Sequence, residues 1–192
     1  MLRKVLTPFV ATMIMSTALY ASAPAPNKDQ AQFEVRFLTM MIDHHYGAVK
    51  MAELCAGRTV HPELQQTCDN IESSQTQEIA TMRSWLQSWY GTDHAPTLTP
   101  KMQRQVDQLS KLTGTEFEQQ FMLMMIPHHA NAIIMATDAL LRAYHPDLLN
   151  MAAKMAGSQA DEIAQMRLWL CRWYLICDLK QAGTDRAGHH DD

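Results

Sequence analysis

The chain has 192 residues, of which 47% are hydrophobic and 19% are charged, and its formal charge is −4. This length fits one domain with a substantial buried core. The chain has no basic stripe, so neither nucleic acid nor an anionic membrane surface is expected as a partner.

The N-terminus predicts an export signal. Arg3 and Lys4 precede an apolar stretch, Val5–Tyr20, and Ala21-Ser22-Ala23 is a small-x-small cleavage site. We interpret residues 1–23 as a secretory signal peptide, with an uncleaved anchor as the alternative. Its removal takes Arg3 and Lys4 away and changes the formal charge from −4 to −6. We expect a soluble periplasmic protein with no membrane contact after cleavage, in a compartment that permits disulfides.

Helical periodicity and turn residues predict four long helices. Proline at the first helical position marks two helix starts, at His61-Pro62 and at His145-Pro146. Thr115 and Glu118 form a capping box that starts another helix. The expected segments are a Pro/Ala-rich tether (24–29), helices over about 30–57, 61–90, 115–143 and 145–177, a linker (91–114) with a short helix opening at Thr99-Pro100, and a disordered tail (179–192).

An internal repeat is the most informative feature of the chain. Residues 33–90 align with residues 117–174 at a constant offset of 84, and 26 of the 58 pairs are identical. Two related hairpins predict an all-α fold, an antiparallel four-helix bundle over residues 30–178 with a pseudo-two-fold axis. The linker is long enough to cross the bundle, which favours a ferritin-like topology over a simple up-down-up-down one.

The repeat preserves a set of methionines and histidines. The recurring residues are Met40, Met41, His44, His45, Met51 and Met82 in the first copy, and Met124, Met125, His128, His129, Met135 and Met166 in the second. Thioether and imidazole together are ligands that suit the soft ion Cu(I), and the same donors suit Ag(I). His44 lies in the middle of an apolar helix face, where a polar group needs a partner. The alternative is a methionine-rich core with hydrogen-bonded histidines.

The expected register of the hairpins brings other polar side chains to the same level. If Cys55 faces Cys68 across the turn, His44 lies opposite Ile79. His45 is rotated toward the neighbouring helix, so one histidine could serve the hairpin and the other the seam between hairpins. The residues expected to orient the imidazoles are Gln75, Glu78, Gln159 and Glu162.

Two cysteine pairs can be formed. Cys55 and Cys68 flank a predicted turn and are both alanine in the second copy, which suggests a disulfide that staples the first hairpin. Cys171 and Cys177 are six residues apart and can pair only if the last helix ends between them. A free thiolate at a copper site is the competing interpretation for either pair.

Other kinds of site fit the sequence less well. A di-iron centre of the ferritin type needs Glu-x-x-His motifs, and no inward glutamate of the repeat has a histidine three residues later. The sequence also lacks the spacing of a structural zinc site, a nucleophile elbow and a Walker motif. We interpret His61 and His145 as helix caps rather than as metal ligands.

The pattern Phe-x-x-Met-Met-Ile-x-His-His-x-x-Ala-x-x-Met-Ala, followed by Gln-x-x-Glu-Ile-x-x-Met-Arg-x-Trp-Leu, resembles the domain of unknown function 305 family, which includes CopM-type periplasmic copper-binding proteins. The resemblance covers residues 33–174. It implies a ferritin-like bundle that binds Cu(I) or Ag(I) through the twelve recurring methionines and histidines, as a metallochaperone or a metal-resistance buffer. Pro127 replaces Asp43 in the second copy, and a proline inside a helix predicts a different geometry there.

We therefore expect an exported Cu(I)- or Ag(I)-binding protein that works with a copper exporter or acceptor protein and needs no catalytic turnover. Two alternatives remain. One is a redox enzyme that oxidises Cu(I) or a substrate at the same sites. The other is a structural or protein-binding helical module with a methionine-rich core.

Overall fold

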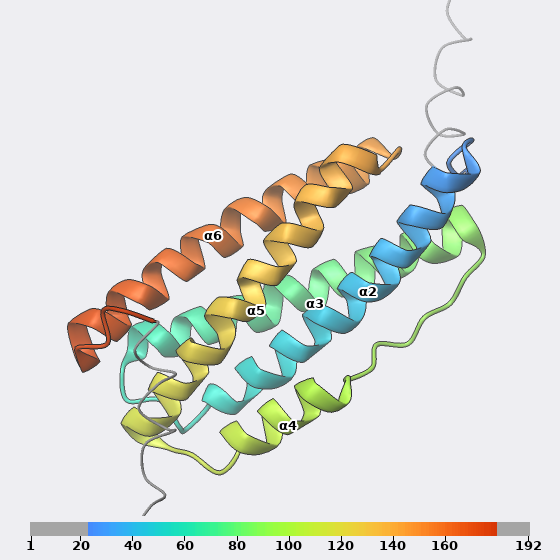
Figure 1. The fold of residues 1–192 in the computed structure, drawn as a ribbon. Coiled ribbons are helices and arrows are strands. Elements are labelled where there is room, and N and C mark those ends of the chain that lie inside the picture. Colours follow the sequence, from blue (N-terminus) through green and yellow to red (C-terminus); the bar gives the residue numbers. More distant parts are fainter. Residues whose placement is uncertain (1–22, 180–192) are drawn as a thin grey trace, which may run out of the picture.

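The computed structural model describes residues 23–179, so the predicted signal peptide, apart from Ala23, and nearly all of the predicted tail lie outside it. The predicted all-α class is confirmed (Figure 1). The elements are α2 (Lys28–Ala52), the 3₁₀ helix η1 (Glu53–Cys55), α3 (Pro62–Tyr90), α4 (Pro100–Leu109), α5 (Gly114–Arg142) and α6 (Pro146–Tyr174). None of the helices within this part of the chain combines the length and apolar composition that a membrane crossing needs.

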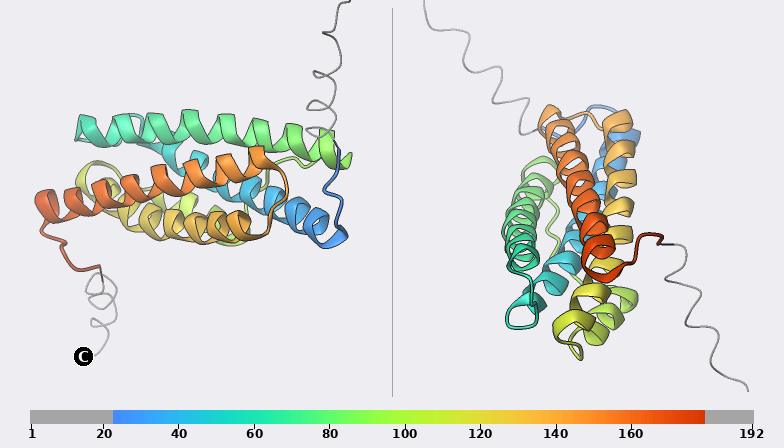
Figure 2. Two further views of the ribbon diagram at one scale, coloured as in Figure 1. Left: turned by 90° about the horizontal axis from the view of Figure 1, so that it is seen from above. Right: turned by 90° about the vertical axis from the view of Figure 1, so that its left-hand side faces the viewer.

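The four long helices form two antiparallel hairpins, α2 with α3 and α5 with α6, and the hairpins meet along α2 and α5 (Figures 1 and 2). The linker and α4 run back along α2, so α5 begins at the end of the molecule where α3 also begins (Figure 1). There, the N–H of Gly114 donates a hydrogen bond to the carbonyl of Arg58. This is the crossover that the long linker predicts. Both clusters of the hydrophobic core combine side chains from all four long helices.

Both cysteine pairs form disulfides, which excludes a free thiolate at a metal site. Cys55–Cys68 joins η1 to α3 and closes the first hairpin, as predicted. Helix α6 ends at Tyr174, between Cys171 and Cys177, which is the condition that this second pair requires. The residue that ends the helix, Leu175, has a left-handed backbone with φ of 58°.

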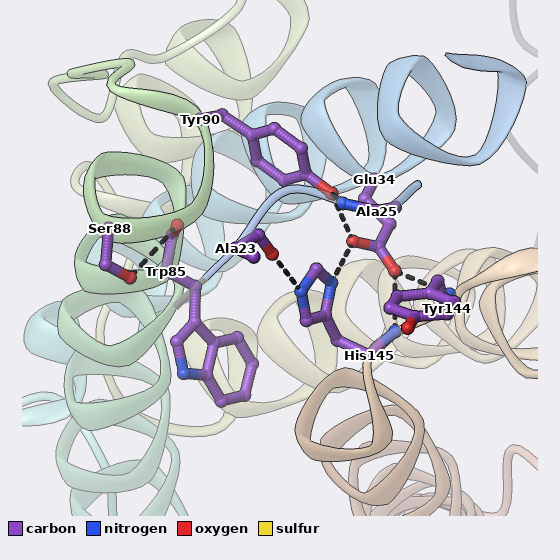
Figure 3. Close-up of polar contacts among 8 residues, drawn as sticks. All are labelled: Ala23, Ala25, Glu34, Trp85, Ser88, Tyr90, Tyr144 and His145. Atoms are coloured by element: carbon purple, nitrogen blue, oxygen red, sulfur yellow. Dashed lines mark hydrogen bonds and ion pairs between the residues drawn. The ribbon is translucent and has the colours of Figure 1, made fainter. Parts of the chain in front are cut away.

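A buried glutamate fastens the first hairpin to the second (Figure 3). Glu34 accepts hydrogen bonds from the backbone N–H groups of Tyr144 (2.6 Å) and His145 (2.9 Å). It also accepts bonds from the hydroxyl of Tyr90 (2.5 Å) and from Nδ1 of His145 (2.6 Å). Nε2 of the same ring lies 2.8 Å from the carbonyl oxygen of Ala23. We call Glu34, Tyr90 and His145 the first clasp.

The pseudo-two-fold axis relates the first clasp to a second one, which is formed by Glu118, Tyr174 and His61. Glu118 accepts bonds from the N–H groups of Val60 and His61 (2.7 Å each), from Nδ1 of His61 (2.6 Å) and from the hydroxyl of Tyr174. Burial alone would raise the pKa of each glutamate, Glu34 as well as Glu118, but these hydrogen bonds outweigh it and hold both pKa values below the ordinary range.

Two predictions about helix capping are wrong, because the side chains concerned belong to the clasps. The side chains of His61 and His145 make no capping hydrogen bond to the helices that they precede. Glu118 does not complete a capping box with Thr115, because its carboxylate is used by the loop of the other hairpin. A buried carboxylate that accepts several charge-assisted bonds is more stable than one that caps an exposed helix end.

Candidate metal site

The four repeated histidines gather where α2 crosses α5, and one from each helix lies in the seam between them. The rings of His44 and His128 face each other with centroids 3.7 Å apart and an interplanar angle of 40°. The 84-residue offset relates these two residues, so the closest contact of the seam lies on the pseudo-two-fold axis. The seam therefore brings together one imidazole from each copy of the repeat.

The other two histidines turn into their own hairpins. Nε2 of His45 lies 2.7 Å from Oε2 of Glu78, and the two are hydrogen bonded. Nε2 of His129 lies 2.6 Å from Oε2 of Glu162, but the atoms are not aligned as a hydrogen bond. The predicted approach of the two glutamates to imidazoles is thus present, although the register had placed His44, rather than His45, inside the hairpin. Two adjacent residues differ by about 100° around a helix, and periodicity alone did not decide which one faces the seam.

The predicted role of two glutamines is not supported by a contact. The Oε1 atoms of Gln75 and Gln159 are buried and have no hydrogen-bond partner among the described residues. The glutamines lie within the hairpins, whereas the seam histidines lie between them, so these amides do not orient His44 or His128 by a hydrogen bond.

Several ring nitrogens at the seam lack a partner as well. Nδ1 of His44 and both nitrogens of His128 are buried with no hydrogen bond among residues 23–179. Burial, and then the nearby His45 and His129, lower the pKa of His44 to about 3. Burial and the neighbouring histidines also lower the pKa of His128 well below its ordinary value. Both imidazoles are therefore neutral near pH 7, with lone pairs available to a metal ion.

The methionines divide into two sets rather than meeting at one point. Met41 and Met82 belong to one core cluster, with Met135 packed against it. Met51, Met125 and Met166 belong to the other, with Met124 packed against it. Each set thus includes one methionine from the other copy of the repeat, Met135 in the first set and Met51 in the second. Met40 and Met51 are 11 residues apart, which is about 16 Å along a helix, so they cannot bind the same ion.

Exposure differs strongly within the predicted ligand set. Met40 is 57% exposed, and with Met135 it lines a pocket of about 140 Å³ at the α2–α5 surface. The other methionines of the set are buried or half-buried. This pocket is thus lined by two of the repeated thioethers.

Histidine and acidic side chains do not by themselves make a metal site here. Within residues 23–179, no three His, Cys, Asp or Glu side chains converge in a way that could hold an ion. The seam offers two neutral imidazoles, and because all four cysteines are in disulfides, the soft sulfur donors that remain are thioethers. This donor set fits a soft monovalent ion, which accepts low coordination numbers, better than it fits zinc or iron.

The structure also explains why Asp43 is replaced by proline in the second copy. Oδ1 of Asp43 accepts bonds from Nε2 of His94 and from the N–H of Thr97, both at 2.8 Å, and so holds the linker against α2. Its counterpart Pro127 is exposed within a continuous α5. His94 carried no interpretable signal in the sequence because it lies outside the repeat.

The sequence profile of the Domain of unknown function (DUF305) family matches residues 34–170. The chain belongs to the DUF305 family. No curated protein matches the chain.

Solved structures show the same fold. CopM in its Cu(I)-bound form is 31% identical, with a TM-score of 0.66 over 73% of this chain and 97% of that one. CopM in an Ag-bound form obtained by soaking is 31% identical, with a TM-score of 0.65 over 73% and 96%. A DUF305 fragment from Deinococcus radiodurans is 26% identical, with a TM-score of 0.66 over 78% and 99%.

Proposed function

We propose that this DUF305 protein binds Cu(I) or Ag(I) outside the cytoplasm and acts as a metallochaperone or a metal-resistance buffer. The observation that carries the proposal is the pair His44 and His128, whose neutral rings meet in the seam with buried nitrogens that lack partners. A buried polar atom without a partner costs roughly 1–3 kcal/mol, and a bound ion removes that cost.

The surrounding methionines support a soft ion. A thioether carries no charge and never has to lose a proton, so it binds Cu(I) even under mildly acidic conditions. CopM, whose structures include Cu(I)-, Cu(II)- and Ag-bound forms, shares the fold at 30–31% identity. The proposed ligands are the twelve repeated methionines and histidines. They are His44 and His128 in the seam, His45 and His129 within the hairpins, seven methionines in or against the two core clusters, and the exposed Met40.

His45, which turns into the first hairpin, is oriented by a carboxylate. Glu78 binds His45, which fixes the ring in one orientation, as carboxylates do for metal-binding histidines in general. We propose that export through the predicted signal peptide places the protein in the periplasm. A copper exporter or an acceptor protein would supply or receive the ion.

The test is an anaerobic Cu(I) titration of the purified protein against a chromophoric competitor. We expect tight uptake by the wild type and weaker uptake by the double variant His44→Ala/His128→Ala. His61→Ala is the matched control, because His61 belongs to the second clasp and is expected to leave copper uptake unchanged.

Each alternative predicts a different result. If the wild type does not compete for Cu(I) at any stoichiometry, the seam is a core feature and the protein is a structural or protein-binding module. In that case, the double variant changes only the stability. A redox enzyme instead shows repeated turnover when the loaded protein is exposed to oxygen, whereas a chaperone or buffer releases or retains its ion without turnover.

A further inference from the structure

One methionine outside the repeat lies beside the seam. Met102 is on α4, the short helix of the linker, and its side chain approaches α2 at Gly47. A methyl group on the Cα of Gly47 would stand 3.1 Å from Sδ of Met102 and 3.5 Å from Nε2 of His128. The thioether sulfur and a buried ring nitrogen without a partner therefore border the same small space.

The glycine itself points to this close approach. Gly47 lies inside α2 with ordinary helical geometry, where glycine is the least favourable residue after proline. Its counterpart in the second copy is Asn131, which lies on the exposed surface of α5. No backbone requirement explains a glycine at residue 47, whereas a Cβ there would lie 3.1 Å from the sulfur of Met102, which would then have to move by a few tenths of an ångström.

The linker is fixed in the position that this approach needs. Thr99 caps α4, and its hydroxyl accepts a bond from the N–H of Met102 (3.2 Å). The N–H of Thr97 is bound by Asp43, the residue that directly precedes His44. At the other end of α4, Leu109 is buried in the core. Met102 is thus held over the seam from both sides.

We propose that Met102 is a third ligand at the seam and supplies a thioether to the ion bound by His44 and His128. This inference rests on the proposed Cu(I)- or Ag(I)-binding function and adds a donor that the duplication did not provide. Two neutral imidazoles and one thioether form a three-coordinate set suited to a soft monovalent ion. Because the linker occurs once, the site has one such thioether, and its two sides are not equivalent.

The experiment compares wild type, Met102→Leu, Gly47→Ala and the control Met151→Leu in Cu(I) and Ag(I) titrations. Leucine keeps the volume of methionine and removes only the sulfur. Met151 lies on α6, away from the seam. We expect Met102→Leu to bind at least about 10-fold more weakly, since even residues that only support metal ligands are worth roughly 10–100-fold. X-ray absorption should show one sulfur fewer around copper.

Gly47→Ala provides an independent check. Alanine favours the helix, so the apo protein should remain folded or unfold at a higher temperature, yet the new methyl group displaces the sulfur and should weaken binding. If the wild type binds copper but Met102→Leu matches it in affinity and sulfur count, Met102 is packing only and the proposed function stands. If the wild type binds no ion, the proposed function fails, and the inference fails with it.

Discussion

The first clasp should be a large and local contribution to stability, and Glu34→Ala tests it. Glu34 is fully buried and accepts four hydrogen bonds, two of them from backbone N–H groups that cannot turn to another acceptor. Each buried donor left without an acceptor costs roughly 1–3 kcal/mol. Removing one side of a buried charged network typically costs about 3–5 kcal/mol in total. We expect a loss of this size in the free energy of unfolding.

The assay is equilibrium unfolding in urea, monitored by the circular dichroism signal of the helices. For a domain of this size, a loss of about 3–5 kcal/mol corresponds to a fall of roughly 6–20 °C in Tm. Glu34→Gln should cost less, because its amide oxygen can still accept both backbone N–H groups. Glu72→Ala, an exposed glutamate on α3, is the control and should change stability by no more than about 0.5 kcal/mol.

The second clasp allows the same substitution to be compared at a more exposed position. The His61 side chain is 32% exposed, whereas that of His145 is 2% exposed. Water can therefore replace part of what Glu118 provides, and Glu118→Ala should cost less than Glu34→Ala. A loss below about 1 kcal/mol for Glu34→Ala, or a greater loss for Glu118→Ala, would refute the argument that burial of these bonds sets their contribution.

Two further predictions follow from single residues. The pKa of His44 is lowered from 6.5 to about 3 in the fold, so the unfolded chain takes up a proton first and the apo protein should lose stability as pH falls below about 6.5. The charged forms of His45 and His129 would repel a protonated His44, and Lys101 adds positive charge near His128. At pH 4.5 the stability lost through His44 is on the order of 2–3 kcal/mol. When unfolding in urea is measured at pH 7 and at pH 4.5, the free energy of unfolding should therefore change less for His44→Gln than for the wild type. Leu175 adopts a left-handed backbone that Gly91 provides in the first copy, so Leu175→Gly should stabilise the protein by roughly 0.5–1 kcal/mol, and an unchanged urea midpoint would contradict this.

The helices could be predicted from the sequence because their signals are local. Proline at the first helical position placed the starts of α3 and α6, and hydrophobic periodicity placed their lengths. The turn between Cys55 and Cys68 suggested the first disulfide, whereas the second depended on whether the last helix ends between Cys171 and Cys177, which the sequence left open. Boundaries were less accurate where the chain leaves the regular helix, as at η1, which continues α2 as a 3₁₀ turn.

The clasps could not be predicted in the same way, because their bonds join residues 56 to 111 positions apart. A signal was nevertheless present, since Glu34, His61 and Tyr90 are all identical in the second copy. Identity across a duplication shows that a residue matters in both halves but does not reveal its partner. Met102 carried no such signal at all, because it has no counterpart in the repeat.

The linker accounts for the main differences between the two copies near the seam. Asp43, whose counterpart in the second copy is Pro127, holds the linker. Gly47, whose counterpart is Asn131, leaves room for α4. Duplication alone would give a symmetric pair of histidines with identical surroundings. The single linker runs along α2 and breaks that symmetry, and two of the 32 positions that differ between the copies, 43 and 47, lie where it contacts α2. The asymmetry of the seam is therefore a consequence of connecting two equivalent hairpins with one chain.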